Sequence, residues 1–389
     1  MGISEKQIEY GSDKSADKQK ALREAGNMNP GFQEMADKVY AHLNDEISRK
    51  IFEARRLYAS TGDLGYITGL ESKYRNLNSD MQVYVEKLQK GSHCLIYGAG
   101  VAGHYLAGRF KQFGVNVDCF IDQDESKGPV DKETGIKVIN EKELLENKAL
   151  YGGKTVVVSY PVKPVAYEVK KRLVEDIGID ENNIRMGIYD WRNNQGQYFD
   201  YFAPGDNEVF VDCGCFDGAT CYNFAGWCGH KGFDHIYAFE ADKKNYKKCR
   251  ETLAPLGKCD LFPFGTADAD KKVYFAAEAF ETSRIISREE AEKRNFEGVD
   301  EIETRALDDV LEGKRITFIK MDIEGAEYEA LLGARKLIME NRPRMAISVY
   351  HKFEDFVTLA DLVLKMHPDY RIAYRHYGFD DLETVMYVE

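Results

Sequence analysis

The chain has 389 residues, 43% hydrophobic and 31% charged, which indicates a globular protein with two or three domains and excludes a fibrous or wholly disordered one. A formal net charge of −13 argues against general binding to nucleic acid or an anionic membrane, because affinity for phosphate comes mainly from lysine and arginine. With no apolar run of about 18 residues and no signal-peptide core, we expect no membrane span, a cytoplasmic location and eight free cysteine thiols.

The first part of the chain, residues 1–90, is expected to be a disordered start followed by a helical arm. Residues 1–30 are charged and poor in large apolar side chains. From Phe32 to about Leu88, apolar residues recur at helical spacing, which predicts two to four helices. These helices carry no recognisable chemistry, so we interpret them as a packing arm or as a contact between two copies in a homodimer.

A Rossmann-like half is predicted for residues 91–195. Strands are expected at 92–97, 115–122 and 154–159, with a helix ending near residue 113. Gly98, Gly100 and Gly103 lie between the first strand and this helix, where backbone amides suit a phosphate, and Asp122 ends the next strand. Two interpretations stay open: a nucleotide or sugar-nucleotide site at these four residues, and a ligand-free structural or partner-docking domain.

Residues 196–389 alternate clearly between strands and helices. Strands are predicted at 208–212, 235–240, 259–264, 316–322 and 344–350. Helices are predicted at 218–228, 242–253, 326–340 and 354–366, with a less regular region around 266–311. The last two apolar segments, 370–377 and 383–389, have a connection too short for a parallel crossover, so they must pair antiparallel.

The glycine loop of this last region points to the kind of ligand. Gly214 and Gly218 permit a tight turn after a buried strand, but Asp212 and Asp217 on either side would repel a pyrophosphate. A cationic ligand is favoured over a dinucleotide. S-adenosylmethionine carries a sulfonium and an ammonium, and Glu240, at the end of the next strand, is placed to hold its ribose hydroxyls.

Four strings of this sequence resemble, in their order and spacing, the FkbM-type S-adenosylmethionine-dependent methyltransferases. They are VFVDCGCFDGAT, YAFEAD, FIKMDIEGAEYEALLGA and SVYHKFEDF. The resemblance covers about residues 196–389. It implies an α/β class I methyltransferase sheet with an antiparallel hairpin at its C-terminal edge, preceded here by the smaller Rossmann-like domain and the helical segment. It also implies O-methylation of a small-molecule acceptor, and the nucleotide-like domain at residues 91–195 favours a carbohydrate or a sugar nucleotide as that acceptor.

The resemblance and the strand ends together give the expected contacts. Cofactor contacts are expected from Tyr198, Asp212, Cys213, Gly214, Asp217, Gly218, Thr220, Glu240, Ala241, Thr266, Ala267, Asp268 and Asp322. Substrate contacts are expected from Ser283, Arg284 and Glu324. For Tyr198, which belongs to the aromatic segment before the first strand, packing between domains is the alternative to covering the cofactor.

Three residues are the catalytic candidates: Asp322 and Glu324 after the fourth strand, and His351 at the end of the fifth. An imidazole titrates near neutral pH and suits the role of general base for a hydroxyl group. Alternatives remain for each. His351 could be a structural histidine, Glu324 could cap the helix that starts near Ala326, and all three could hold a divalent metal ion.

Two other classes of function remain open. One is a nicotinamide- or sugar-nucleotide-dependent enzyme that uses the glycine loop at 98–103. The other is a non-catalytic binding protein that has kept the fold.

Overall fold

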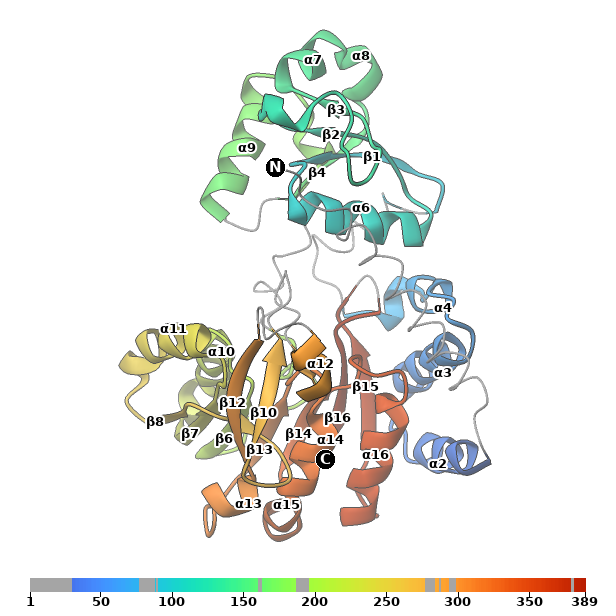
Figure 1. The fold of residues 1–389 in the computed structure, drawn as a ribbon. Coiled ribbons are helices and arrows are strands. Elements are labelled where there is room, and N and C mark those ends of the chain that lie inside the picture. Colours follow the sequence, from blue (N-terminus) through green and yellow to red (C-terminus); the bar gives the residue numbers. More distant parts are fainter. Residues whose placement is uncertain are drawn as a thin grey trace. The chain divides into compact units, whose positions relative to one another are not determined.

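The computed structural model describes residues 30–76, 88, 90–159, 163–186, 196–276, 284–286, 288–293, 299–378 and 381–389. The chain forms two compact units (Figure 1). The large unit combines residues from Met1–Asn76 and Gln195–Glu389, and the small unit comes from Leu77–Asn194. The predicted disordered start, residues 1–29, lies outside the described residues.

A seven-stranded sheet forms the centre of the large unit, in the order β15-β16-β14-β13-β6-β7-β8. Its strands are β6 (Glu208–Cys213), β7 (Phe233–Phe239), β8 (Cys259–Phe262), β13 (Phe318–Met321), β14 (Arg344–Ser348), β15 (Ile372–His376) and β16 (Thr384–Val388). The strands from β8 to β14 are parallel, and β16 is antiparallel to both of its neighbours. The predicted class I methyltransferase fold, with its antiparallel hairpin, is confirmed.

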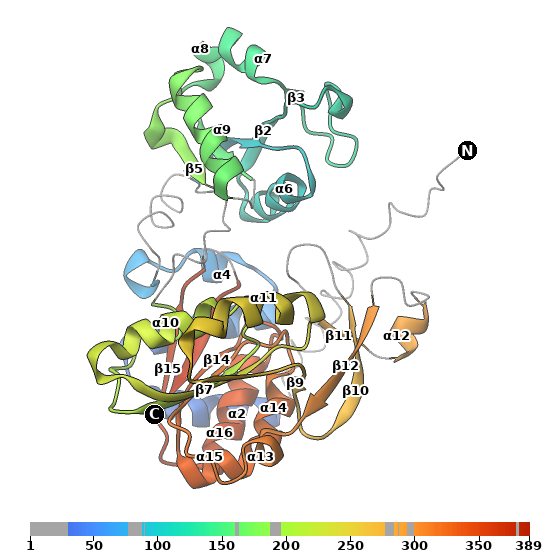
Figure 2. The same cartoon turned by 90° about the vertical axis from the view of Figure 1, so that its left-hand side faces the viewer.

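Helices cover both faces of this sheet (Figure 2). One face carries α10 (Ala219–Cys228) and α11 (Lys243–Leu253), and the other carries α14 (Glu327–Gly333), α15 (Arg335–Asn341) and α16 (Asp355–Met366). The alternation along β6 explains this. Val209 and Val211 join the core with α14 to α16, whereas Phe210 joins the α10 core and stacks on Phe224 with ring centroids 4.4 Å apart.

The region predicted to be irregular contains a second, four-stranded sheet in the order β11-β10-β12-β9. Its elements are β9 (Gly265–Thr266), β10 (Lys271–Ala276), β11 (Arg284–Ile286), α12 (Arg288–Lys293) and β12 (Val299–Arg305), and α13 (Leu307–Val310) follows. In β12 only Ile302 and Thr304 are buried. A strand with one wet face and charged residues has a weak apolar signal, which is why the sequence did not reveal it.

The N-terminal helices pack on the sheet of their own chain. They are α2 (Pro30–Ala41), α3 (Glu46–Thr61), α4 (Gly65–Thr68) and the short η2 (Ser72–Tyr74). Helix α3 lies along β15 and α2 along α16 (Figure 1). Polar contacts hold α3 in place: Asp45 pairs with Arg375 at 2.7 Å, and the Tyr58 hydroxyl donates to Asp381 at 2.6 Å. A role of the arm in a homodimer stays a prediction.

The small unit is a five-stranded parallel sheet of Rossmann-like type, in the order β3-β2-β1-β4-β5. Its strands are β1 (His93–Tyr97), β2 (Asn116–Ile121), β3 (Val138–Ile139), β4 (Thr155–Val158) and β5 (Ile184–Met186). Its helices are α6 (Val101–Phe113), α7 (Glu141–Glu146), α8 (Lys148–Tyr151) and α9 (Lys163–Glu175), with short turns at Glu125–Lys127 and Glu181–Asn183.

In the part of the chain that the structure describes, no helix combines the length and apolar character that crossing a membrane requires.

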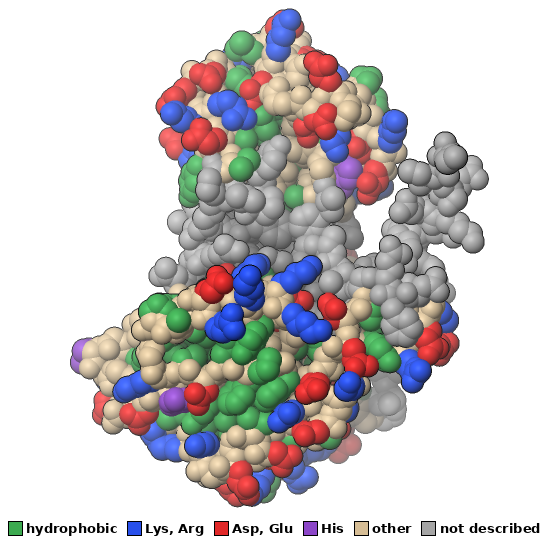
Figure 3. Space-filling view, turned by 60° about the vertical axis from the view of Figure 1, so that its left-hand side comes forward, with side chains coloured by type: hydrophobic (Ala, Val, Ile, Leu, Met, Phe, Trp, Pro, Cys, Tyr) green, Lys and Arg blue, Asp and Glu red, His purple; other side chains and the backbone are tan. Residues whose placement is uncertain are grey.

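Positive charge gathers on one side of the large unit. Figure 3 faces the side of the large unit that carries α11, where lysine and arginine side chains gather. Helix α11 exposes Lys243, Lys244, Lys247, Lys248 and Arg250. The acidic chain therefore has a locally basic helix.

Candidate functional site

The loop between β6 and α10 needs glycine at two positions. Gly214 has φ 79°, and a Cβ atom there would lie 2.1 Å from the carbonyl oxygen of Asp322. Gly218 has φ 84° and comes directly before α10, where a Cβ atom would lie 3.0 Å from the Leu253 side chain. Larger residues would strain the backbone and push the loop off β13. The glycines therefore let the loop after β6 lie directly against the chain after β13.

Asp212 lies beneath this loop and not on its surface. Its side chain is fully buried, and Lys320 Nζ is 3.0 Å from its Oδ1. The two residues are cross-strand partners in the β13–β6 register, and the Cys221 thiol donates to the second carboxylate oxygen at 3.3 Å. The charge of Asp212 is therefore balanced inside the protein, and its predicted contact with the cofactor stays a prediction.

Lys320 is a site residue that the sequence reasoning missed. Its Nζ donates to the Gly214 carbonyl at 2.6 Å and lies 5.4 Å from the centre of the Tyr198 ring. Burial lowers the lysine pKa, but the carboxylates of Asp212 and Asp322 outweigh this effect and raise it above its usual value. The available signal was a lysine inside the apolar run Phe-Ile-Lys-Met, because a buried charge requires a partner.

Glu240, directly after β7, shapes the same loop from the other side. Its two carboxylate oxygens accept hydrogen bonds from the backbone amides of Phe216 at 2.9 Å and Asp242 at 2.8 Å. Only 8% of the residue is exposed, and burial raises its pKa to about 7. The predicted position at the strand end is therefore as expected, and the carboxylate is held rigidly there.

Asp322 connects the loop to the rest of the site. Tyr198 OH donates to its Oδ2 at 2.8 Å and Tyr350 OH donates to its Oδ1 at 3.1 Å. Burial raises the pKa of Asp322, but Lys320 and His351 together hold it below its usual value. The tyrosine takes a positive φ of 75° to reach this place. Tyr198 thus lies beside Asp322, and its contact with the cofactor stays a prediction.

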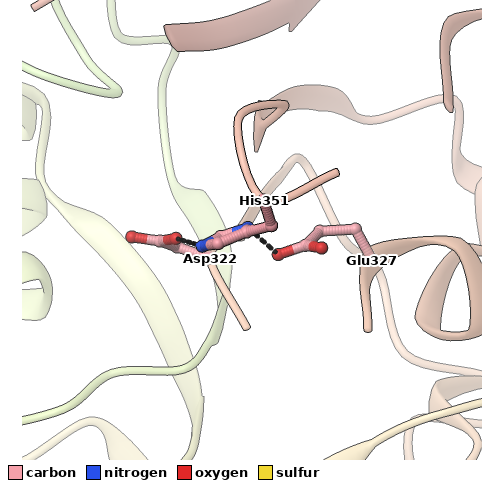
Figure 4. A group of neighbouring side chains, drawn as sticks. All are labelled: Asp322, Glu327 and His351. Atoms are coloured by element: carbon pink, nitrogen blue, oxygen red, sulfur yellow. Dashed lines mark ion pairs between the residues drawn. The ribbon is translucent and has the colours of Figure 1, made fainter. Parts of the chain in front are cut away.

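Three carboxylates surround the His351 imidazole, and Figure 4 shows two of them, Asp322 and Glu327. Nδ1 is 3.0 Å from Glu327 Oε1, and Nε2 is 3.5 Å from Asp322 Oδ1 and 3.6 Å from Glu324 Oε2. Side chains of Asp322, Glu327 and His351 lie close enough to share a metal ion. The ring lies between the two acids, with Nδ1 near Glu327 and Nε2 near Asp322.

The expectation that His351 titrates near neutral pH is wrong for this arrangement. Burial lowers the histidine pKa, but the carboxylates of Glu327, Asp322 and Glu324 outweigh it and raise the pKa to about 10. The ring therefore carries a proton at neutral pH as long as all three acids face it. A base role requires that the site lose some of this negative charge first.

Glu324 does not cap the following helix. Ala326 precedes α14 and offers no side-chain cap, whereas Glu327 reaches back and accepts from the Ile323 amide at 2.9 Å. Glu324 keeps 37% of its side chain exposed, adopts φ 59°, and has a pKa raised by its surroundings, desolvation being the largest cause. It therefore faces the open side of the site, as a substrate contact would.

The remaining predicted contacts differ in accessibility. Thr266 and Ala267 are buried, and the Ala267 carbonyl lies against Gly333. Asp268 is 43% exposed and pairs with Lys271 at 2.6 Å. Cys213 is buried at the end of β6, while Asp217, Thr220 and Ala241 are partly exposed around the loop. Arg284 begins β11, and Ser283 lies outside the described residues.

The small unit repeats the glycine loop with other contacts. Asp122 accepts from the Ala99 amide at 2.7 Å and from the Asp124 amide at 2.9 Å. A Cβ atom on Gly103 would lie 1.9 Å from the Gly98 carbonyl oxygen, whereas one on Gly100 would meet nothing within 4 Å. Gly103 therefore serves close packing, and a nucleotide at this loop stays a prediction.

Comparisons with known proteins agree on the family. The description of the matching family is "Methyltransferase FkbM domain", over residues 212–380. A curated relative, the 2-O-methyltransferase NoeI of Sinorhizobium fredii strain NGR234, is 27% identical over 149 residues, which cover 34% of this chain and 60% of that protein. The chain thus spans about 60% of the length of this relative.

Solved structures give partial superpositions. A methyltransferase FkbM from Methylobacillus flagellatus KT is 18% identical with a TM-score of 0.49, over 88% of this chain and 99% of that one. Aeropyrum pernix fibrillarin, solved with S-adenosyl-L-methionine, is 10% identical with a TM-score of 0.30, over 48% and 69% of the two chains. Residues 212–380 of this chain therefore match the methyltransferase FkbM domain, and the strand order of the large unit agrees with that match.

Proposed function

We propose that this protein transfers a methyl group from S-adenosylmethionine to a hydroxyl oxygen of a small polyoxygenated acceptor, such as a sugar or sugar nucleotide. The observation that carries the proposal is the surplus of carboxylates where the parallel strands end. Glu240, Asp322 and Glu324 lie there, and the two cations among them, Lys320 and His351, already face acids. Such an edge favours a positively charged ligand and disfavours a pyrophosphate.

The residues present fit this cofactor. Glu240 would accept hydrogen bonds from the ribose hydroxyls, because its carboxylate is fixed by two loop amides and offers further lone pairs. Asp322 stays ionised beside the loop and would face the cationic part. Because residue 214 is glycine, no side chain separates the loop after β6 from the backbone of Asp322. When bound, the cofactor supplies a methyl group on a positively charged sulfur, which displacement by a nucleophile relieves.

Two features support an oxygen acceptor. The relative NoeI is described as a 2-O-methyltransferase. In addition, Glu324 is a partly exposed carboxyl group beside the site with a pKa raised to about 8, so near neutral pH it can both donate and accept hydrogen bonds, which suits a ligand rich in hydroxyl groups. In-line displacement then depends mainly on holding the hydroxyl close to the methyl carbon and opposite the sulfur.

Calorimetric titration with S-adenosylmethionine and with NAD tests the cofactor. We expect the sulfonium compound to bind and NAD to leave the protein unchanged. Tight binding of NAD that S-adenosylmethionine cannot displace would contradict the proposal. If neither binds, a non-catalytic role of the fold gains support.

A label-transfer assay tests the acceptor class. The protein is incubated with methyl-labelled cofactor and fractions of cell extract, and labelled products are identified by mass spectrometry. We expect label in a small, hydroxyl-rich compound. Label found only in protein or nucleic acid would contradict the proposed acceptor while leaving methyl transfer in place.

A further inference from the structure

Glu327 is the most deeply buried of the acids around His351. Only 1% of its side chain is exposed. One oxygen, Oε1, accepts from the Ile323 amide at 2.9 Å and lies 3.0 Å from His351 Nδ1. Among the described residues, the other oxygen and both ring nitrogens have no well-aligned hydrogen-bond partner. A buried carboxylate anchored by a backbone amide, and turned toward a buried ring, has a fixed position from which it can orient that ring.

The orientation of the ring follows from this anchor. With Nδ1 directed at Glu327 inside the protein, Nε2 is directed at Asp322 and Glu324. These two side chains keep 24% and 37% of their surface exposed, whereas the His351 side chain keeps only 10%. The nitrogen that can reach a ligand is therefore Nε2 (Figure 4).

We propose that Glu327 is a positioning residue that holds the His351 imidazole with Nε2 toward the acceptor, so that the pair removes the acceptor proton during methyl transfer. This rests on the proposed function. The general arrangement, a carboxylate that fixes the tautomer and orientation of a histidine base, is known from other enzyme classes.

The acceptor oxygen forms a bond to the methyl carbon while the bond from that carbon to sulfur breaks and its electron pair stays on sulfur. The hydroxyl proton passes to Nε2 of the neutral imidazole, whose Nδ1 proton is held by the carboxylate of Glu327. His351 becomes positively charged between acids, and it returns its Nε2 proton to solvent before the next turnover.

The charges around the ring set when the imidazole can act. It faces Asp322 and Glu324 from the loop after β13 and Glu327 from α14, and it also interacts electrostatically with Asp355 in α16. On its own segment, the Tyr350 ring lies beside it, with ring centroids 4.2 Å apart. A cationic cofactor bound beside Asp322 would offset the negative charge of these carboxylates. It would thereby lower the pKa of His351 from its ligand-free value of about 10. Cofactor binding thus brings the base closer to its working form.

Kinetics of matched variants test the pair. Glu327→Gln keeps an oxygen for the Ile323 amide and for Nδ1 but removes the charge. We expect the rising limb of the kcat profile to move to lower pH by one to three pH units, as an opposite charge at this distance typically shifts a pKa by about that amount. His351→Asn should lower kcat by about 10²–10⁴-fold. Glu329→Gln, on the same helix, is the control and should change neither quantity.

The double variant separates positioning from structure. If Glu327 acts through the imidazole alone, adding Glu327→Gln to His351→Asn should change kcat less than about twofold. A further loss in that background as large as in the wild type would overturn the proposal. A fall in kcat for Glu327→Gln that has the same size at every pH would also overturn the proposal, because a merely structural role of Glu327 would produce it.

A readout without an acceptor keeps the inference separate from the proposed function. Histidine-selective NMR labelling, with His351→Asn to assign the signal, gives the pKa of His351 in the holoprotein and in Glu327→Gln. A pKa that falls in the variant supports the pair even if no methyl acceptor is found, and an unchanged pKa overturns it. Loss of activity on dialysis against EDTA, restored by Mg²⁺ or Mn²⁺, would also overturn it, because the same residues would then bind an ion.

Discussion

The two units carry the same kind of glycine loop, and both control it with an acid after the second strand. In the small unit, Asp122 accepts from two backbone amides near the loop. In the large unit, Glu240 does the same. A carboxylate in this place can therefore be explained by loop structure alone. Its presence does not distinguish a binding site from a structural turn.

What lies beneath the loops does distinguish them. In the large unit, Asp212 and Lys320 are cross-strand partners at the last-but-one position of β6. The corresponding partners in the small unit are the apolar Ile96 and Val157. A buried ion pair contributes little stability compared with an apolar pair of similar volume, so its presence indicates a functional demand. From this comparison we expect the chemistry in the large unit.

The largest expected effect comes from breaking that pair. Asp212→Ala removes the carboxylate that pairs with the buried charge of Lys320, and we expect a loss of about 3–5 kcal/mol in the unfolding free energy of the large unit, with loss of cofactor binding. Denaturant titration with a probe in each unit measures this. The double variant Asp212→Leu with Lys320→Met should recover most of the stability but not the binding. Tight binding by Asp212→Ala would contradict our placement of the site.

The glycines give the next largest effect. Gly214→Ala forces a side chain into φ 79° and against the Asp322 carbonyl, so we expect cofactor affinity to fall by about tenfold or more, from about 1–2 kcal/mol of strain. Gly103→Ala should destabilise the small unit and leave cofactor affinity unchanged. Gly100→Ala is the control, since its Cβ atom meets nothing. If Gly103→Ala weakens cofactor binding, the separation between the two loops fails.

A smaller effect is expected from pH. Glu240 has a pKa of about 7, and its ionised form is the better acceptor for ribose hydroxyls. Cofactor affinity should therefore rise severalfold between about pH 6 and 8 in the wild type relative to Glu240→Gln. Folding raises the pKa of Glu240, so the effect of pH on stability is opposite to its effect on affinity. The contribution of Glu240 to the free energy of unfolding is complete below the pKa of the unfolded chain and is lost as the pH rises through 7. If the cofactor affinity of the wild type and that of Glu240→Gln changed with pH in the same way, the role of Glu240 in binding the ribose would be contradicted.

The smallest effect is expected at Asp268, which is one of the predicted cofactor contacts. The carboxylate pairs with Lys271 on the surface, and such pairs contribute about 0–1 kcal/mol. Asp268→Asn should thus change the unfolding free energy by no more than this. A calorimetric cofactor titration of the variant decides whether Asp268 also contacts the ligand, and a large drop in affinity would bring it back into the site.

Much of the fold followed from local patterns. The apolar runs that became β6, β7, β13 and β14 lie within a few residues of their predicted bounds, because strands buried on both faces have a strong signal. The final hairpin followed from the length of its connection. The predicted helix 326–340 is divided at Ala334 into α14 and α15, and its apolar periodicity did not predict this break.

The site was harder because its contacts join distant segments. Asp212, Glu240, Asp322 and His351 could be named from strand ends. The pairing of Asp212 with Lys320 depends on strand register, which the sequence does not reveal. The pKa of His351 depends on acids from separate elements, and Glu327 was overlooked because a glutamate in a first helical turn has a ready explanation as a helix-stabilising charge.

The docking of α3 onto β15 ties the beginning of the described chain to its end. The Ser48 hydroxyl accepts from the Tyr374 amide at 2.9 Å, and the Asn76 amide donates to the His376 carbonyl at 2.8 Å. During synthesis these early helices must wait for partners that emerge some three hundred residues later, after the whole small unit has been made. We therefore expect the small unit to fold first on the ribosome and the large unit only after release, with its apolar helix faces exposed to chaperones in between.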